Sequence, residues 1–223
     1  MPNLATVDWQ RYLIQVIVIL LSITLHEFGH AFSADRLGDL TPRREGRVTL
    51  WPDKHFDPLG FIMILWTSLG GRGLGWGKPV MVNPNNFKHP RRDMSIVAAS
   101  GPLMNLILAV VFGLVLRAAV TMYPDAAYDW IDHTVSGTFV FSFVSLNLLL
   151  MFFNLIPMHP LDGGKLLSNA LPFDQSVRFD RFFYQFGPVI LLVLVFSGTG
   201  FLGTVVGPPM KTMMKLITGL DIN

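Results

Sequence analysis

The chain has 223 residues, of which 51% are hydrophobic and 14% are charged, and its formal net charge is +2. Soluble domains carry about 25% charged residues, so this composition excludes an ordinary soluble protein and indicates an integral membrane protein. The small net charge gives no basis for nucleic-acid binding, and the lack of cysteine excludes disulfides and thiolate metal ligands. Any metal site must use histidine and carboxylate groups.

The first apolar run extends from Tyr12 to Phe32 and is long enough to cross about 30 Å of hydrocarbon. Near its end it carries the sequence HEFGH, in which His26 and His30 flank Glu27. Two histidines four residues apart lie on one face of a helix and can bind one metal ion, with the glutamate beside it. A buried helix of a soluble protein could show the same spacing, but the composition argues against it. Such groups inside a membrane segment predict a functional site.

Further apolar stretches follow along the chain. They cover residues 56–71, 94–116, 134–157, 182–196 and, more weakly, 200–220. The last is interrupted by Gly207-Pro208-Pro209, so it is either a broken span or an interfacial helix. The pattern predicts an all-α integral membrane protein with five to six transmembrane or re-entrant segments around a three-helix catalytic core. We expect one polytopic membrane domain over residues 1–223, with its core at 12–165 and accessory C-terminal spans at 180–220.

Basic residues surround the second apolar stretch on both sides. Before it stand Arg36, Arg43, Arg44, Arg47 and Lys54, and after it stand Lys78, Lys88, Arg91 and Arg92. The positive-inside rule places both groups in the cytoplasm, so we expect residues 56–71 to make a re-entrant or hairpin excursion instead of a full crossing. Residues 71–88 alternate Gly, Pro and Val and predict a short β-hairpin before the second core helix, with an edge for a substrate strand. A cytoplasmic loop without substrate contact is the alternative.

The third core span, 134–157, then returns to the cytoplasmic side and ends in the sequence NLIPMHPLDGG at 154–164. Its end meets the end of the first span at a similar depth in the membrane. Asp162 is therefore the best candidate for the third protein ligand that a two-histidine zinc site needs. The neighbouring prolines and glycines allow the chain to break and turn the carboxylate inward. The alternative is an interfacial turn in which Asp162 caps the next helix.

Together these motifs resemble the site-2 protease family of intramembrane zinc metalloproteases, the peptidase M50 type, in its compact prokaryotic form without PDZ or CBS domains. HEFGH at 26–30 is similar to the family's HExxH, and NLIPMHPLDGG at 154–164 is similar to its LDG signature. SGPLMN at 100–105 resembles the Gly-Pro-x-x-Asn of the intervening core helix, and GKPVMVNP at 77–84 resembles the segment before that helix. The resemblance covers residues 12–165.

The resemblance implies that His26, His30 and Asp162 bind one Zn²⁺ per chain and that Glu27 is the general base. It also implies that Asn154 lines the active site and steadies the substrate or the developing oxyanion. The implied function is regulated intramembrane proteolysis, the hydrolysis of peptide bonds in or near transmembrane segments of membrane-protein substrates. We expect the lipid bilayer and a transmembrane protein or peptide as partners, and a prokaryotic inner membrane as the location, with the active site toward the cytoplasm.

Two alternative functions use the same residues. A catalytically silent scaffold of the same fold would bind membrane helices, but it would have no need of Glu27. A metal transporter would use Glu27 as a ligand and would need further polar residues along several spans. The other apolar segments largely lack such residues, so the sequence favours the protease.

Several further residues are expected to have structural roles. His159 is expected to lie behind the ligands or to face the cytoplasm. Gly101-Pro102 and Asn105 are expected to serve close helix packing. The remaining histidines are expected to be solvated in loops; they are His55, His89 and His133.

Overall fold

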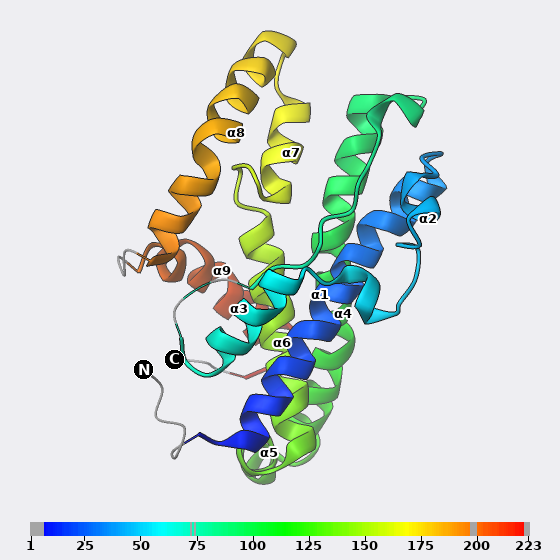
Figure 1. Ribbon diagram of the computed structural model, residues 1–223. Helices are drawn as coiled ribbons and strands as arrows, with labels where there is room; N and C mark the ends of the chain where they lie inside the picture. Colours follow the sequence, from blue (N-terminus) through cyan, green and yellow to red (C-terminus); the bar gives the residue numbers. More distant parts are fainter. Residues whose placement is uncertain (1–6, 72, 74, 197–199, 221–223) are drawn as a thin grey trace.

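The computed structural model describes residues 7–71, 73, 75–196 and 200–220, and helices make up most of this part of the chain (Figure 1). The long helices are α1 (Trp9–Arg36), α4 (Pro90–Met122), α6 (Val135–Asn154), α8 (Phe173–Phe196) and α9 (Phe201–Thr218). The shorter elements are α2 (Thr41–Arg44), η2 (Pro52–His55), α3 (Pro58–Ser68), η3 (Pro84–Asn86), α5 (Pro124–His133) and α7 (Asp162–Ala170). The predicted all-α membrane fold is confirmed.

Four of the described helices, α1, α4, α6 and α8, are long and apolar enough to cross a membrane. α3 has 11 residues and spans about 16 Å, half of the hydrocarbon thickness, which agrees with a re-entrant excursion. α9 continues through Pro208 and Pro209 as one helix of 18 residues, and it is not among the four candidate spans.

Polar side chains fix where three of the helices begin. Asp8 accepts a hydrogen bond from the Arg11 amide at the start of α1 (3.1 Å), and Asp57 accepts one from the Gly60 amide at the start of α3 (2.9 Å). Thr134 does the same for the Gly137 amide at the start of α6 (3.0 Å). Each cap satisfies an amide that would otherwise lack a partner in the first helical turn.

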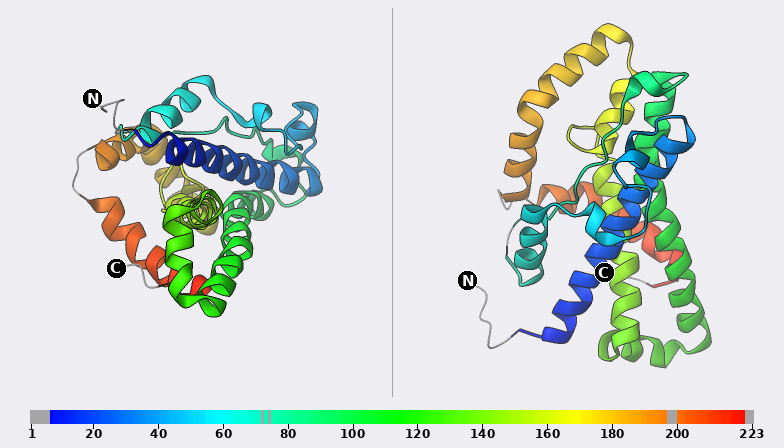
Figure 2. Two further views of the ribbon diagram at one scale, coloured as in Figure 1. Left: turned by 90° about the horizontal axis from the view of Figure 1, so that it is seen from below. Right: turned by 45° about the vertical axis from the view of Figure 1, so that its right-hand side comes forward.

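The centre of the molecule is a bundle of α1, α4 and α6, which lie side by side (Figure 2). Two clusters of buried side chains pack against α6. One joins α4, α5, α6 and α9 through Ala109, Leu116, Ile131, Val144, Leu148, Met214 and Leu220. The other joins α1 to α6 through Ile14, Val18 and Phe143. The bundle therefore fixes α1, which carries HEFGH, against the helix that leads to Asp162.

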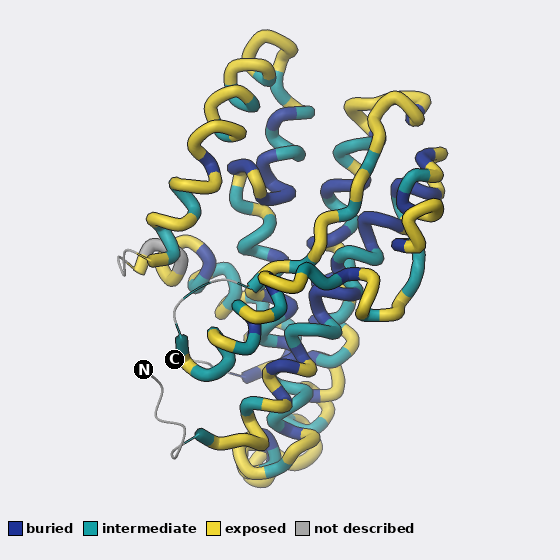
Figure 3. Tube along the Cα trace, viewed as in Figure 1, coloured by how far each residue is buried: buried dark blue, intermediate teal, exposed yellow. Residues whose placement is uncertain are grey.

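α8 stands apart from this bundle and contacts α7 and α9. Most of its length is exposed in the structure, whereas burial is concentrated in the central helices (Figure 3). Its exposed side chains are largely apolar, including Phe182, Val189 and Leu192. In an integral membrane protein such a face meets lipid, where exposed apolar groups carry no penalty.

The segment between α3 and α4 differs from its prediction. Within the described residues, 75–83 is extended and forms a single isolated bridge, between Gly77 and Phe56, so the predicted β-hairpin is wrong; residues 72 and 74 lie outside the described residues. Pro79 and Pro84 supply no amide donors for a ladder. The backbone instead bonds other segments, with the Lys78 amide donating to the His55 carbonyl at 2.8 Å.

Asp39, just after α1, holds this extended segment in place. Its side chain is fully buried and accepts four hydrogen bonds, from the Thr41 amide and hydroxyl, the Asn83 amide and the Asn86 side chain, at 2.6–3.1 Å. Burial by itself raises the pKa of Asp39, but the hydrogen bonds from Thr41, Asn86 and Asn83 outweigh it and lower the pKa below its ordinary value. The ionised carboxylate therefore stabilises the fold.

We expect Asp39→Asn to lower the free energy of unfolding by about 1–3 kcal/mol at pH 7, because the amide group turns a donor toward buried donors. A depressed folded-state pKa gives stability that is present above the unfolded value of about 3.9 and is lost as the pH falls through the folded value. The deficit of the variant should therefore shrink in acid. Thermal unfolding in detergent at pH 7 and near pH 3 measures it, with the exposed Asp53→Asn as the control. A deficit independent of pH would contradict the assignment.

Candidate metal centre

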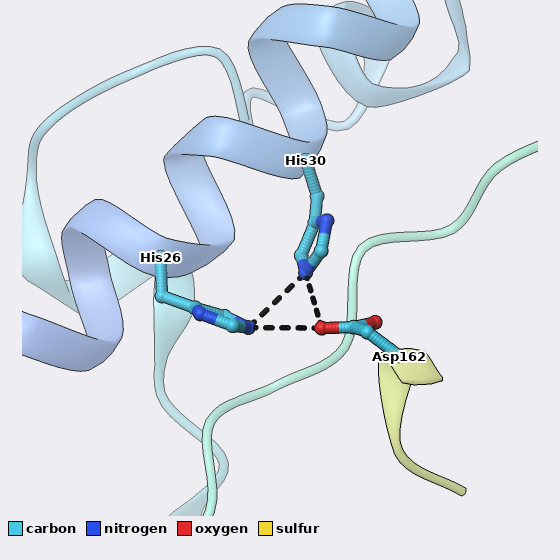
Figure 4. Close-up of side chains that lie close together, drawn as sticks. All are labelled: His26, His30 and Asp162. Atoms are coloured by element: carbon cyan, nitrogen blue, oxygen red, sulfur yellow. Dashed lines mark hydrogen bonds and ion pairs between the residues drawn. The ribbon is translucent and has the colours of Figure 1, made fainter. Parts of the chain in front are cut away.

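Two helices bring three potential ligand atoms together at one point (Figure 4). His26 and His30 lie one turn apart on α1, and Asp162 is the first residue of α7. The two Nε2 atoms are 3.1 Å apart, and Oδ2 of Asp162 lies 3.1 Å from Nε2 of His30 and 3.3 Å from Nε2 of His26. All three residues are buried.

Hydrogen bonds on the outer edges of the two rings fix which nitrogen carries hydrogen. Nδ1 of His30 lies 2.7 Å from the Val97 carbonyl, which can only accept, so Nδ1 is the donor. Nδ1 of His26 lies 2.6 Å from Oδ1 of Asn105 and donates to it in the same way. In the neutral rings both Nε2 atoms therefore carry lone pairs that face each other and a carboxylate oxygen. This arrangement is repulsive unless a metal cation or a proton lies between them.

The three distances fit zinc. Zinc binds imidazole nitrogen and carboxylate oxygen at about 2.0–2.1 Å in tetrahedral sites, which places neighbouring ligand atoms about 3.3 Å apart. The observed separations of 3.1–3.3 Å match this value without rearrangement. Three protein ligands and one open position are the arrangement of catalytic zinc sites, whereas structural sites use four protein ligands.

A buried amide network orients the His26 ring. Asn105 on α4 donates from its amide nitrogen to Oδ1 of Asn147 on α6 (2.7 Å). Asn147 in turn donates to the Ser22 hydroxyl (2.9 Å) and to the Phe143 carbonyl (2.8 Å). The network assigns the orientation of both amides and leaves Oδ1 of Asn105 as the acceptor for His26. Sequence reasoning placed Asn105 in helix packing and missed this contact.

Close approach of α4 to the two imidazoles requires glycine at position 101. A Cβ there would lie 2.6 Å from Cε1 of His26 and also overlap the His30 ring. On the facing helix, a Cβ at Gly29 would lie 2.8 Å from the Ser100 carbonyl oxygen. The two glycines let α1 and α4 cross in contact at the level of the site, so the SGPLMN motif at 100–105 serves both packing and the site.

Lys165 orients the Asp162 carboxylate. Its ammonium group lies 3.2 Å from Oδ1, one helical turn further along α7. The other carboxylate oxygen, Oδ2, is the one that faces the histidines. Each oxygen of Asp162 therefore has its own cationic or imidazole partner, which favours a carboxylate that binds through one oxygen.

His159 and His55 have surroundings different from those expected. His159 is buried, its Nε2 lies 2.9 Å from Oδ1 of Asp180, and its ring stacks on Tyr184 of α8. It attaches α8 to the turn before Asp162, and its burial excludes the expected solvent-facing position. His55 is fully buried, not solvated; its Nε2 lies 2.8 Å from the Thr49 carbonyl, and burial lowers its pKa. His89 is exposed, as expected.

The two residues with predicted catalytic roles lie outside the three-residue cluster. Glu27 lies between the two histidines in sequence and is partly buried. Its Oε2 lies 3.9 Å from Nη2 of Arg47. Asn154 is the last residue of α6, and its amide donates to the Leu150 carbonyl at 3.0 Å. A side-chain amide has two N–H donors, so one remains for a ligand.

Comparisons with known proteins agree with this chemistry. The family model for peptidase family M50 matches residues 118–194. Three relatives whose names begin "Putative zinc metalloprotease" are YwhC of Bacillus subtilis, and Rip2 and Rip3 of Mycobacterium tuberculosis. YwhC is 38% identical over 187 residues, covering 83% of this chain and 81% of YwhC. Rip2 is 36% identical over 81% of this chain and 65% of its own length. Rip3 is 30% identical over 87% of this chain and 40% of its own length. No solved structure matches the chain significantly.

Asn105→Leu should weaken zinc binding about 10- to 100-fold, because His26 loses the acceptor that fixes its tautomer and ring orientation. Competition against a chelator of known affinity, using purified protein in detergent, measures the dissociation constant. Asn105→Asp keeps an acceptor oxygen and should bind zinc more tightly than the leucine variant. Asn85→Leu, at an exposed asparagine, is the control. Equal affinities of wild type and Asn105→Leu would contradict the network.

Proposed function

This chain belongs to peptidase family M50 and is a zinc metalloprotease, and we propose that it hydrolyses peptide bonds in or near transmembrane segments of membrane-protein substrates. The observation that carries the proposal is the place of the metal-binding cluster. His26 and His30 lie inside a helix that is long and apolar enough to span a membrane. A protease whose reactive groups lie within a span acts on substrates that enter the membrane.

We assign His26, His30 and Asp162 as the zinc ligands and Glu27 as the general base. Zinc, when bound, acidifies water and polarises a peptide carbonyl. Glu27 then accepts a proton from the attacking water and delivers it to the leaving amine. Asn105 and Val97 keep both imidazoles in the tautomer that leaves Nε2 free, and Lys165 holds the second oxygen of Asp162.

The depth of the site supports an opening toward the cytoplasm of a prokaryotic cell. His26 is about 25 Å along α1 from its first residue, Trp9, so the cluster lies near the far end of the span. That end leads into the segment with Arg36, Arg43 and Arg44, which the positive-inside rule places in the cytoplasm. Water for hydrolysis would enter from this side, in an inner membrane.

A substrate helix must unwind locally before its carbonyls can react, because helical hydrogen bonds shield them. The extended segment near the site supports this step. Gly77 lies against α1, and a Cβ there would be 3.5 Å from Cγ of Glu27. We propose that an unwound substrate runs beside this segment, which offers an extended partner close to the general base.

We also propose that residues 1–223 act as one polytopic domain, with the protease core at 12–165 and accessory spans at 180–220. The contacts of α8 support this division for that helix, whereas α9 also packs against α4 and α6. α8 contacts α7 and α9, whereas α1, α4 and α6 contact one another. His159 joins α8 to the turn that precedes Asp162.

Glu27→Gln should abolish cleavage while zinc stays near one per chain, because the amide cannot accept the proton but is not a ligand. Zinc content and the cleavage of a panel of single-span peptides in liposomes measure the two effects. Glu45→Gln, at the only other glutamate of the chain, is exposed and should cleave like wild type. Bound zinc without cleavage by wild type would favour the scaffold or, with metal flux across the liposomes, the transporter. Loss of zinc in Glu27→Gln would make Glu27 a ligand.

Asn154→Ala should lower kcat about 10²- to 10³-fold, the range for removal of one oxyanion donor. Zinc affinity should be unchanged, because Asn154 makes no contact with the cluster within the described residues. Steady-state kinetics on the best peptide of the panel measure the effect, and Asn85→Ala controls for loss of an exposed amide. An unchanged kcat would remove Asn154 from the mechanism.

A further inference from the structure

Arg47 is a buried cation next to the proposed general base. It lies in the loop after α2, and its side chain is 3% exposed. Three other arginines of this region lie close to it in sequence and are exposed: Arg36, Arg43 and Arg44. Arg43, for example, is 65% exposed and pairs with Asp35. Topology signals work from the membrane surface, so the positive-inside rule does not explain why Arg47 is buried.

The hydrogen bonds of Arg47 join two separate segments. Nη1 donates to the Lys54 carbonyl at 2.5 Å, and Nη2 donates to the Lys78 carbonyl. The same two segments also meet through the Lys78 amide, which donates to the His55 carbonyl, and through the bridge between Phe56 and Gly77. Arg47 therefore lies at the junction of the turn at 54–56 and the extended segment at 77–78.

Among the residues that the structure describes, the charge of Arg47 has one carboxylate within ion-pair distance. Its hydrogen-bond acceptors are neutral carbonyls, which do not balance a buried positive charge. Glu27 is the acidic residue within ion-pair distance, with Oε2 at 3.9 Å from Nη2, and its side chain is 15% exposed. Glu45 adds a weaker attraction from an exposed position. The guanidinium is thus fixed by two backbone carbonyls and faces Glu27.

We propose that Arg47 is a positioning residue that holds the Glu27 carboxylate in its reactive place and locks the 54–56 turn to the 77–78 segment beside it. The inference rests on the proposed role of Glu27 as general base. Gly77 completes the arrangement, because a side chain there would collide with Ile23 at 2.6 Å and reach Glu27. Arg47 thus acts through Glu27 and through the junction of residues 54–56 with residues 77–78 beside it, and it does not contact the proposed zinc ligands.

The kinetic test compares Arg47→Gln with Arg44→Gln, which removes the same charge from an exposed position at the end of α2, three residues earlier. Misplacing a catalytic group by about 1 Å costs about 10²-fold in rate, so Arg47→Gln should lower kcat by about that factor. Zinc should stay near one per chain, because Arg47 contacts none of the three proposed ligands. KM should change less than kcat, because loosening the 77–78 segment weakens one substrate contact whereas the proposed base itself is misplaced. Arg47→Lys keeps the charge but lacks the planar fork of N–H groups that donates to both carbonyls, so its kcat should lie between those of wild type and Arg47→Gln.

A second measurement tests the junction of residues 54–56 with residues 77–78 and does not depend on catalysis. The chain has no cysteine, so nitroxide labels on Asp53→Cys and Met81→Cys, both exposed, report the distance between the two segments without background. Arg47→Gln should broaden this distance distribution, and Arg44→Gln should leave it unchanged.

The outcomes separate the inference from the proposed function. Absence of cleavage by wild type would reject the proposed function, and the label distances would still test whether Arg47 holds residues 54–56 against residues 77–78. With an active wild type, a kcat of Arg47→Gln within threefold of wild type, or an unchanged distance distribution, overturns the inference. A parallel loss of zinc and kcat in both Arg47→Gln and Arg47→Lys also overturns it, because Arg47 would then be required only for folding.

Discussion

The structure depends on one electrostatic constraint, the convergence of three lone pairs in an apolar bundle. Nε2 of His26, Nε2 of His30 and Oδ2 of Asp162 lie within 3.3 Å of one another. The outer nitrogens of both rings already donate to Asn105 and Val97, so neither ring, while neutral, can turn a hydrogen inward without losing a bond. In a medium of low dielectric this repulsion is strong, and a bound divalent cation turns it into attraction.

That constraint fixes how the central helices pack. The backbone of α4 must approach α1 closely enough for Val97 and Asn105 to reach the imidazoles, which requires glycine at 29 and 101. Once Asn105 is buried, its own amide needs an acceptor, and Asn147 on α6 supplies it. A half-satisfied network would cost more than an apolar core. The same polar contacts that hold the rings therefore set the rotation of three helices about their axes.

Sequence reasoning reached the residues whose chemistry is local and missed those whose partners are distant. The four-residue spacing of the histidines in HEFGH at 26–30 is enough to predict a shared metal ion, and Asp162 follows a recognisable break after a span. Asn105 meets His26 across 79 positions of sequence, and an asparagine in a membrane helix predicts packing as readily as ligand support. The β-hairpin was wrong because alternation of Gly, Pro and Val describes an extended chain equally well, and the backbone partners of this segment are Asp39 and His55.

Arg47 is another residue whose role the sequence does not reveal, because its partners lie far from it in the chain. In sequence it is one of several loop arginines, and a count of basic residues treats them alike. The balance of charge around the site distinguishes it. The negative charge of Asp162 is compensated by its proposed metal and by Lys165, whereas Glu27, as the proposed base, must keep its charge free of the metal. A separate cation gives that carboxylate a partner of its own, and Arg47 lies 3.9 Å from it. The guanidinium is suited to this role because it stays charged when buried.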